Sequence, residues 1–118
     1  MYDPDDISLP ENYYDPTEDK PAIYRRMKQY LWSQLSEQQV REAIAHYLEI
    51  CTLTDDIVGM LLDALEDAGV EDNTLVLFTS DHGDQVGGHG LFLKGILPFE
   101  ESYGIPMMVR WPQVVKPG

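Results

Sequence analysis

The stretch Leu75-Val-Leu-Phe-Thr-Ser-Asp-His-Gly-Asp84 decides the fold. Its first four residues, Leu75 to Phe78, are all apolar, and such an uninterrupted run predicts a strand buried on both faces, as in parallel α/β sheets. The run leads straight into Asp81 and His82, so a carboxylate and an imidazole are expected at the carboxyl end of a core strand. Ligands bind at that edge in open α/β sheets. The sequence therefore predicts an α/β domain with a candidate site at Asp81 and His82.

The region before this strand has the pattern of a long amphipathic helix. Ser36 is a good N-cap, and Gln39 three residues later completes a capping box. Gly69 suits the position just after a helix end. Between them, apolar residues recur at spacings of three, four or seven, namely Val40, Ile44, Tyr47, Leu48, Cys51, Val58, Leu62 and Leu65. We expect a helix from Glu37 to about Ala68 that packs on the core strands.

The N-terminal region differs from the rest in composition. Residues 1–21 hold seven acidic side chains and four prolines, which disfavour helix and central strand. We expect an extended, mostly exposed segment that is disordered in isolation, followed by a short helix over 22–34. The sequence thus divides into an extended acidic segment with a short helix at 1–36 and an α/β domain at 37–118.

Charge and composition exclude several partners. The chain has 118 residues, eight Lys and Arg against 21 Asp and Glu, and a formal net charge of −13. Such a surface repels nucleic-acid phosphates and anionic lipid headgroups. No apolar run approaches the roughly 20 residues needed to span a bilayer. Cys51 is the single cysteine, so the chain contains no internal disulfide.

A glycine-rich loop is expected from Gly83 to Pro106, followed by a second short strand at Met107, Met108 and Val109. Structureless stretches of this length are usually functional or mobile. His89 lies between two glycines and is either a third ligand or proton donor, or a histidine that holds the loop by hydrogen bonds. Glu100 and Glu101 are expected to anchor the loop.

Three residues carry the candidate chemistry. Asp81 and His82 suit a divalent cation, although two ligands are not a complete site and an Asp-Gly strand end is also a common turn. Lys94 has apolar neighbours, which suggests an anion-binding role, although the sequence pattern alone slightly favours an ordinary exposed lysine.

The motifs together resemble the type I sulfatases of the alkaline phosphatase superfamily. The resemblance rests on Asn73 through Asp84, Gly88-His-Gly-Leu91, Lys94-Gly95, Tyr103-Gly-Ile-Pro106 and Arg110-Trp-Pro112, with support from the preceding helix. It covers roughly residues 38–118.

This resemblance implies specific roles. Asp81 and His82 would ligate a divalent metal, usually calcium, with manganese or magnesium as alternatives. Lys94 would bind a sulfate oxygen, as a catalytic and substrate-binding residue. The family nucleophile is a formylglycine made from Cys or Ser in a Cys/Ser-x-Pro/Ala-x-Arg motif. Neither the residues after Cys51 nor those after Ser8 match that motif, so the chain is expected to be an internal part of a larger enzyme, truncated at both ends.

We therefore expect a part of a metal-dependent sulfatase that acts on a sulfated small molecule or glycan, inactive alone. Two alternatives stay open at this point: a phosphonate or phosphodiester hydrolase of the same superfamily, and a non-catalytic acidic interaction module built on the long helix. The sequence leaves the compartment and the oligomeric state open.

Overall fold

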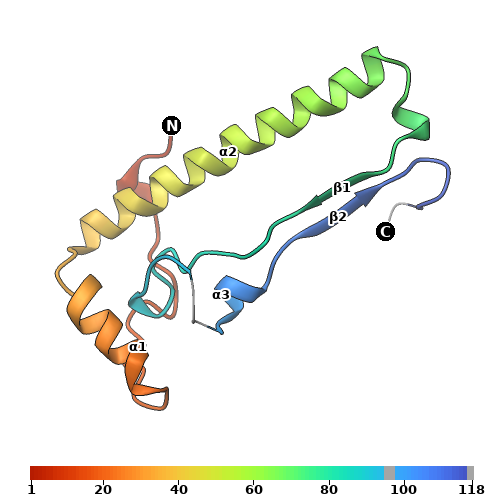
Figure 1. Cartoon of the computed structure of the whole chain (residues 1–118). Helices are drawn as coiled ribbons and strands as arrows, with labels where there is room; N and C mark the ends of the chain where they lie inside the picture. The colour runs from red at the N-terminus through yellow and green to blue at the C-terminus, as the bar shows by residue number, and fades with distance from the viewer. Residues whose placement is uncertain (95–97, 117–118) are drawn as a thin grey trace.

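The computed structural model describes residues 1–94 and 98–116 (Figure 1). In chain order it contains a 3-10 helix (Pro4–Asp6), α1 (Ala22–Met27), a π-helical turn (Lys28–Trp32), α2 (Glu37–Asp67), a 3-10 turn (Glu71–Asn73), β1 (Val76–Thr79), a 3-10 turn (Gly88–Gly90), α3 (Glu100–Tyr103) and β2 (Met107–Arg110). Gly95 of the Lys94-Gly95 pair, and Pro117 and Gly118, lie outside the described residues. In the described part of the chain, no helix is both long and apolar enough to cross a lipid bilayer.

Helix α2 begins and ends where the local sequence signals predict. The hydroxyl of Ser36 accepts a hydrogen bond from the Gln39 backbone N–H at 3.2 Å, and the Gln39 side chain accepts one from the Ser36 N–H at 2.9 Å. At the other end, Gly69 adopts a left-handed φ of 64°. The next N–H, that of Val70, donates to the Leu65 carbonyl at 3.1 Å, which is the Schellman arrangement. Both predicted ends are confirmed.

Strand β1 pairs with β2 in a two-stranded antiparallel sheet, with Val76 opposite Arg110 and Thr79 opposite Met107. Both predicted strands are confirmed, and so is the α/β class. The expectation that the first strand is buried on both faces in a parallel sheet is wrong for this chain, since Leu77 is 52% exposed. Among the described residues β1 has one neighbouring strand, and that strand runs antiparallel, so its other edge and much of its surface remain open.

Helix α2 runs alongside the antiparallel β1–β2 pair (Figure 1), and a hollow of about 700 Å³ lies between the helix and the strands. Tyr47, Cys51 and Val58 line it from α2, and Phe78 and Met108 line it from the strands. The apolar stripe of the helix therefore faces the strands as the sequence predicts. The hollow separates the two, so the stripe does not pack tightly on the strands.

The buried hydrophobic cluster lies near the N-terminal end of α2 (Figure 1). Tyr24 of α1 and Leu91 of the glycine-rich loop are buried together, and Phe99 packs on them. The N-terminal segment joins this region, because Thr17 is fully buried and the Lys28 ammonium donates to the Asp15 carbonyl at 2.7 Å. The segment keeps many exposed acidic side chains, but it also forms turns and packs on the loop, which its composition did not predict.

The loop after β1 is also more regular than expected. It contains the turn at Gly88–Gly90 and the single-turn helix α3 before β2 begins. The glycines permit this path: a side chain at Gly83 would meet the carbonyl oxygen of Glu101 at 1.9 Å. The loop therefore folds back so that α3 lies directly against the residue after His82.

Candidate functional site

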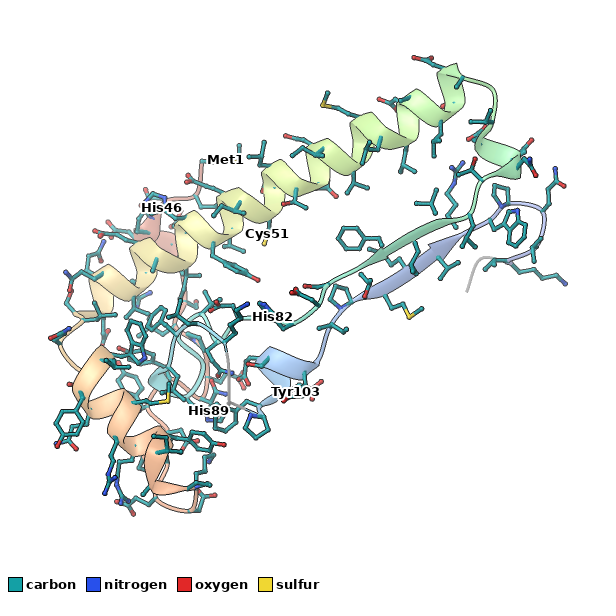
Figure 2. All side chains as sticks on the ribbon, viewed as in Figure 1. Met1, His46, Cys51, His82, His89 and Tyr103 are labelled. Carbon is teal, nitrogen blue, oxygen red and sulfur yellow. The ribbon has the colours of Figure 1, made fainter. Side chains whose placement is uncertain are left out.

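The three residues singled out in the sequence line one hollow. Asp81, His82 and Lys94 share a space of about 400 Å³ with Ser102, Tyr103 and Ile105. Asp81 and His82 follow the end of β1, Lys94 comes from the loop, and the other three belong to α3 or the residues after it. Figure 2 shows His82 beyond the end of β1, with Tyr103 on the neighbouring α3. The fold thus brings these three side chains together at one end of the β1–β2 pair.

A backbone hydrogen bond orients the ring of His82. Its Nδ1 lies 2.9 Å from the carbonyl oxygen of Gly83. A carbonyl accepts hydrogen bonds only, so Nδ1 is the donor in this contact, and Nε2 is the nitrogen turned toward Asp81. Metal-ligating histidines are usually oriented by such a bond from the other ring nitrogen.

Asp81 presents a second electron-pair donor next to the first. Its Oδ1 accepts a hydrogen bond from the His82 backbone N–H at 3.0 Å, which fixes the carboxylate. Its Oδ2 lies 3.5 Å from His82 Nε2. Carboxylate oxygens and imidazole nitrogens are among the ligands that divalent cations take in proteins, so the two side chains could hold one together.

The described residues supply only part of a coordination shell. Within residues 1–94 and 98–116, no three His, Cys, Asp or Glu side chains gather closely enough to hold a metal ion. Divalent cations take four or more ligands in proteins. The pair at Asp81 and His82 therefore fits a metal in its donor chemistry and needs further ligands.

Lys94 supplies the positive charge of this hollow. The residue is exposed, so its ammonium can reach a ligand from solvent. The chain as a whole has a net charge of −13, and Lys94 places a cationic group in the lining of a hollow that also contains Asp81 and His82. A lysine in such a position favours the binding of an anionic ligand.

His89 takes the loop-holding role. Its Nδ1 donates to Oδ2 of Asp15 at 2.6 Å, and its Nε2 accepts from the Asn12 side-chain amide at 3.1 Å. Its ring stacks on Phe99 with centroids 4.2 Å apart. The side chain is mostly buried among these partners, and it is not among the residues that line the hollow at Asp81 and His82. The alternative of a third ligand at that hollow has no support here.

Asn12 and Asp15 are the residues that sequence reasoning missed. The Asn12 amide also donates to Glu101 at 2.7 Å, so it ties the N-terminal segment to α3 and confirms the anchoring role of Glu101. The Lys20 ammonium, 2.8 Å from Asp15, and the Thr17 N–H hold the pKa of the Asp15 carboxyl well below its usual range. The one available signal was Asp15-Pro-Thr17, a turn sequence in which the carboxylate accepts the Thr17 N–H at 2.8 Å.

Helix α3 is fixed to the turn that carries His82. The Gly83 N–H donates to the Ser102 carbonyl at 2.9 Å. The Ser102 hydroxyl, which is buried, accepts from the Gln85 side-chain amide at 2.8 Å. These bonds set the position of α3 relative to Asp81 and His82, and with it the wall of the hollow.

The larger hollow meets this site at His82, which lines both. Figure 2 shows Cys51 on the side of α2 that faces β1. Burial raises the pKa of the Tyr47 hydroxyl on the same side of the helix. The lining of the larger hollow is mostly apolar, so this hollow resembles a part of the core more than a charged binding site.

Comparison with known proteins supports the resemblance seen in the motifs. The family model described as Sulfatase matches residues 5–117, which extends further toward the N-terminus than the motifs do. Arylsulfatase K of Danio rerio is 39% identical over 79 residues, covering 67% of this chain and 15% of that protein. The multifunctional alkaline phosphatase superfamily protein PehA of Trinickia caryophylli is 40% identical over 76 residues, covering 64% of this chain and 15% of that protein.

A solved structure agrees with this result. The crystal structure of yidJ from Bacteroides fragilis, assigned as a sulfatase, is 32% identical and superposes with a TM-score of 0.64, covering 93% of this chain and 24% of that chain. The chain spans about 15% of the length of the curated relatives it matches.

Proposed function

This chain belongs to the sulfatase family, and from that premise we propose that it forms part of the active site of an enzyme that hydrolyses sulfate esters. The proposal is supported by the hollow that holds Asp81, His82 and Lys94 together. The substrate would be a sulfated small molecule or glycan. Hydrolysis breaks the bond between sulfur and the ester oxygen, water supplies the new oxygen, and the departing alcohol takes up a proton.

Asp81 and His82 would hold a divalent metal through Oδ2 and Nε2. Calcium is the first candidate, with manganese or magnesium as alternatives. When bound, the metal would act as a Lewis acid for the reacting sulfate and as a template for its orientation. The further ligands would come from parts of the enzyme beyond the described residues. The hydrogen bond between Nδ1 and the Gly83 carbonyl would orient the ring so that Nε2 is the ligating nitrogen.

Lys94 would bind a sulfate oxygen. Its ammonium would balance the charge of the sulfate and of the leaving oxygen, as a positioned donor does for a developing anion. Asp81 and His82 would thus serve the sulfate through the metal, and Lys94 through its own charge.

The nucleophile would be a formylglycine outside the described residues. The family makes it from Cys or Ser in a specific motif, and Cys51 is followed by Thr52, Leu53 and Thr54, which do not match that motif. Cys51 also lies on α2 in the largely apolar hollow. We therefore assign Cys51 no catalytic role.

The observation that carries the proposal is the convergence of Lys94 with Asp81 and His82. It is tested on the protein expressed from its complete reading frame, loaded with calcium or manganese and assayed on 4-nitrophenyl sulfate. Lys94→Ala should lower kcat/KM by about 100-fold or more, the loss typical of removing one charge-stabilising donor. Lys116→Ala removes an exposed lysine elsewhere and should leave the rate unchanged. Equal rates for both variants would contradict the proposed role.

A second candidate activity is hydrolysis of phosphonate or phosphodiester substrates at the same site. The similarity to PehA favours it, because that relative carries the name of a multifunctional member of the alkaline phosphatase superfamily. Metal, lysine and histidine suit a phosphoryl group as well as a sulfuryl group. The complete protein assayed on matched sulfate and phosphonate esters distinguishes the two by the ratio of kcat/KM.

A further inference from the structure

Tyr103 is a large aromatic side chain left open beside the charged residues of the site. It lines the hollow with Asp81, His82 and Lys94, and it is 68% exposed. Ile105, 42% exposed, lines the same hollow. The hollow thus has a charged part that suits a sulfate and an apolar part next to it.

The backbone of Tyr103 is firmly held although its ring is open. The Tyr103 N–H donates to the Phe99 carbonyl at 3.1 Å within α3. The preceding residue, Ser102, is buried and accepts hydrogen bonds from both Gly83 and the Gln85 side chain. The backbone that carries the Tyr103 ring is therefore hydrogen-bonded to the turn that contains His82.

From this arrangement we propose that Tyr103 binds the alcohol half of the substrate, and that this half carries a six-membered ring that stacks on the tyrosine. This inference rests on the proposed function, because it places the sulfate at Asp81, His82 and Lys94. Ring faces gain from contact with an aromatic side chain and from the removal of apolar surface from water. An acyclic alcohol offers much less of that surface. Aryl and pyranose rings share this chemistry, and the experiment separates them.

The test compares three sulfate esters: phenyl sulfate, glucose 6-sulfate and propyl sulfate. Dissociation constants are measured by saturation-transfer NMR on the complete, metal-loaded protein, at a protein concentration low enough that little ester is hydrolysed during the measurement. The same spectra report which ligand protons contact the protein. Tyr103→Ala should weaken binding of a ring-bearing ester by about 3- to 10-fold, the range for an aromatic contact. Binding of propyl sulfate should change by less than about twofold, and Tyr103→Phe should behave as the wild type because it retains the ring face.

Tyr30→Ala is the matched control, since Tyr30 is 74% exposed on the π-helical turn, outside the hollow. A response with phenyl sulfate alone or with glucose 6-sulfate alone supports the inference and identifies the ring. Equal weakening of all three esters, no weakening of either ring-bearing ester, or no binding by the wild type overturns it. A wild-type protein that binds the esters but hydrolyses none would sink the proposed function and leave the Tyr103 contact standing. Thermal melts confirm that each variant folds.

Discussion

His82 turns Nε2 toward Oδ2 of Asp81, 3.5 Å away, while its Nδ1–H donates to the Gly83 carbonyl at 2.9 Å. A carboxylate oxygen and an imidazole nitrogen are both atom types that bind divalent cations. A bound cation would be attracted to both, and the carbonyl keeps the imidazole in the orientation that this requires. In the proposed enzyme, these two adjacent residues and one backbone group would form half of a metal site at the end of β1.

Metal binding should therefore depend on this pair. In the complete protein, calcium or manganese at 100 times its dissociation constant should raise the free energy of unfolding by about 2.7 kcal/mol. The double variant Asp81→Ala/His82→Ala should lose most of this stabilisation, because two ligands are removed at once. Calorimetric melts with and without metal measure it. Asp72→Ala/His46→Ala removes the same residue types elsewhere and should retain the stabilisation; if both double variants respond alike, the non-catalytic interaction module becomes the better description.

Gly83 should tolerate no side chain. An alanine Cβ there would lie 1.9 Å from the Glu101 carbonyl oxygen, so α3 would have to move away from His82. We expect Gly83→Ala to cost about 1–3 kcal/mol in unfolding free energy, the range for overpacking, and to weaken metal binding as well.

Gly59 provides the control for that change. It lies within α2, and an added Cβ would meet nothing within 4 Å. Gly59→Ala should stabilise the protein by about 1 kcal/mol, because alanine favours the helical backbone. Denaturant unfolding of the two variants gives opposite signs if the close approach at Gly83 is as described, and equal signs if it is not.

The contact between Asp15 and His89 should hold the N-terminal segment to the loop. Asp15→Asn should lower the unfolding free energy at pH 7 by roughly 1–3 kcal/mol, since charge-assisted bonds to Lys20 and His89 weaken. Glu18→Gln removes the same charge from an exposed position in that segment and should have little effect.

The Asp15 effect should also depend on pH. Because the pKa of Asp15 is lowered in the folded protein, its carboxylate stabilises the fold above its unfolded pKa of about 3.9. That contribution is lost as pH falls through the folded pKa. The stability difference between wild type and Asp15→Asn should therefore be constant near neutrality and shrink below about pH 4. If the stability difference stays unchanged at lower pH, the loss of the carboxylate charge is not the cause of the destabilisation in Asp15→Asn.

Residues 1–118 alone should not hydrolyse sulfate esters. The described residues hold two metal-ligand candidates and a lysine, with no third ligand gathered beside them. Purified chain incubated with 4-nitrophenyl sulfate and calcium or manganese should release product at the buffer rate. A measurable rate that disappears in Asp81→Ala would mean that the chain is catalytically sufficient.

Local signals in the sequence determined the elements of this fold. The capping box at Ser36 and the glycine at position 69 set both ends of α2, and they act through hydrogen bonds between residues close in sequence. The apolar run before Asp81 predicted β1 because strand formation follows side-chain type and pattern over a few residues. Asp81 and His82 were found for the same reason: they directly follow that strand.

Contacts between residues far apart in sequence were decided only by the tertiary structure. Only the family resemblance implied that His82 and Lys94 share a site, because the spacing between them does not fix the path of the intervening loop, which packs against α3. Asn12 and Asp15 gave no sign of meeting His89, because hydrogen bonds across more than 70 positions leave no periodic pattern. The exposure of Leu77 likewise followed from which strand pairs with β1, a choice that an apolar run in the sequence does not encode.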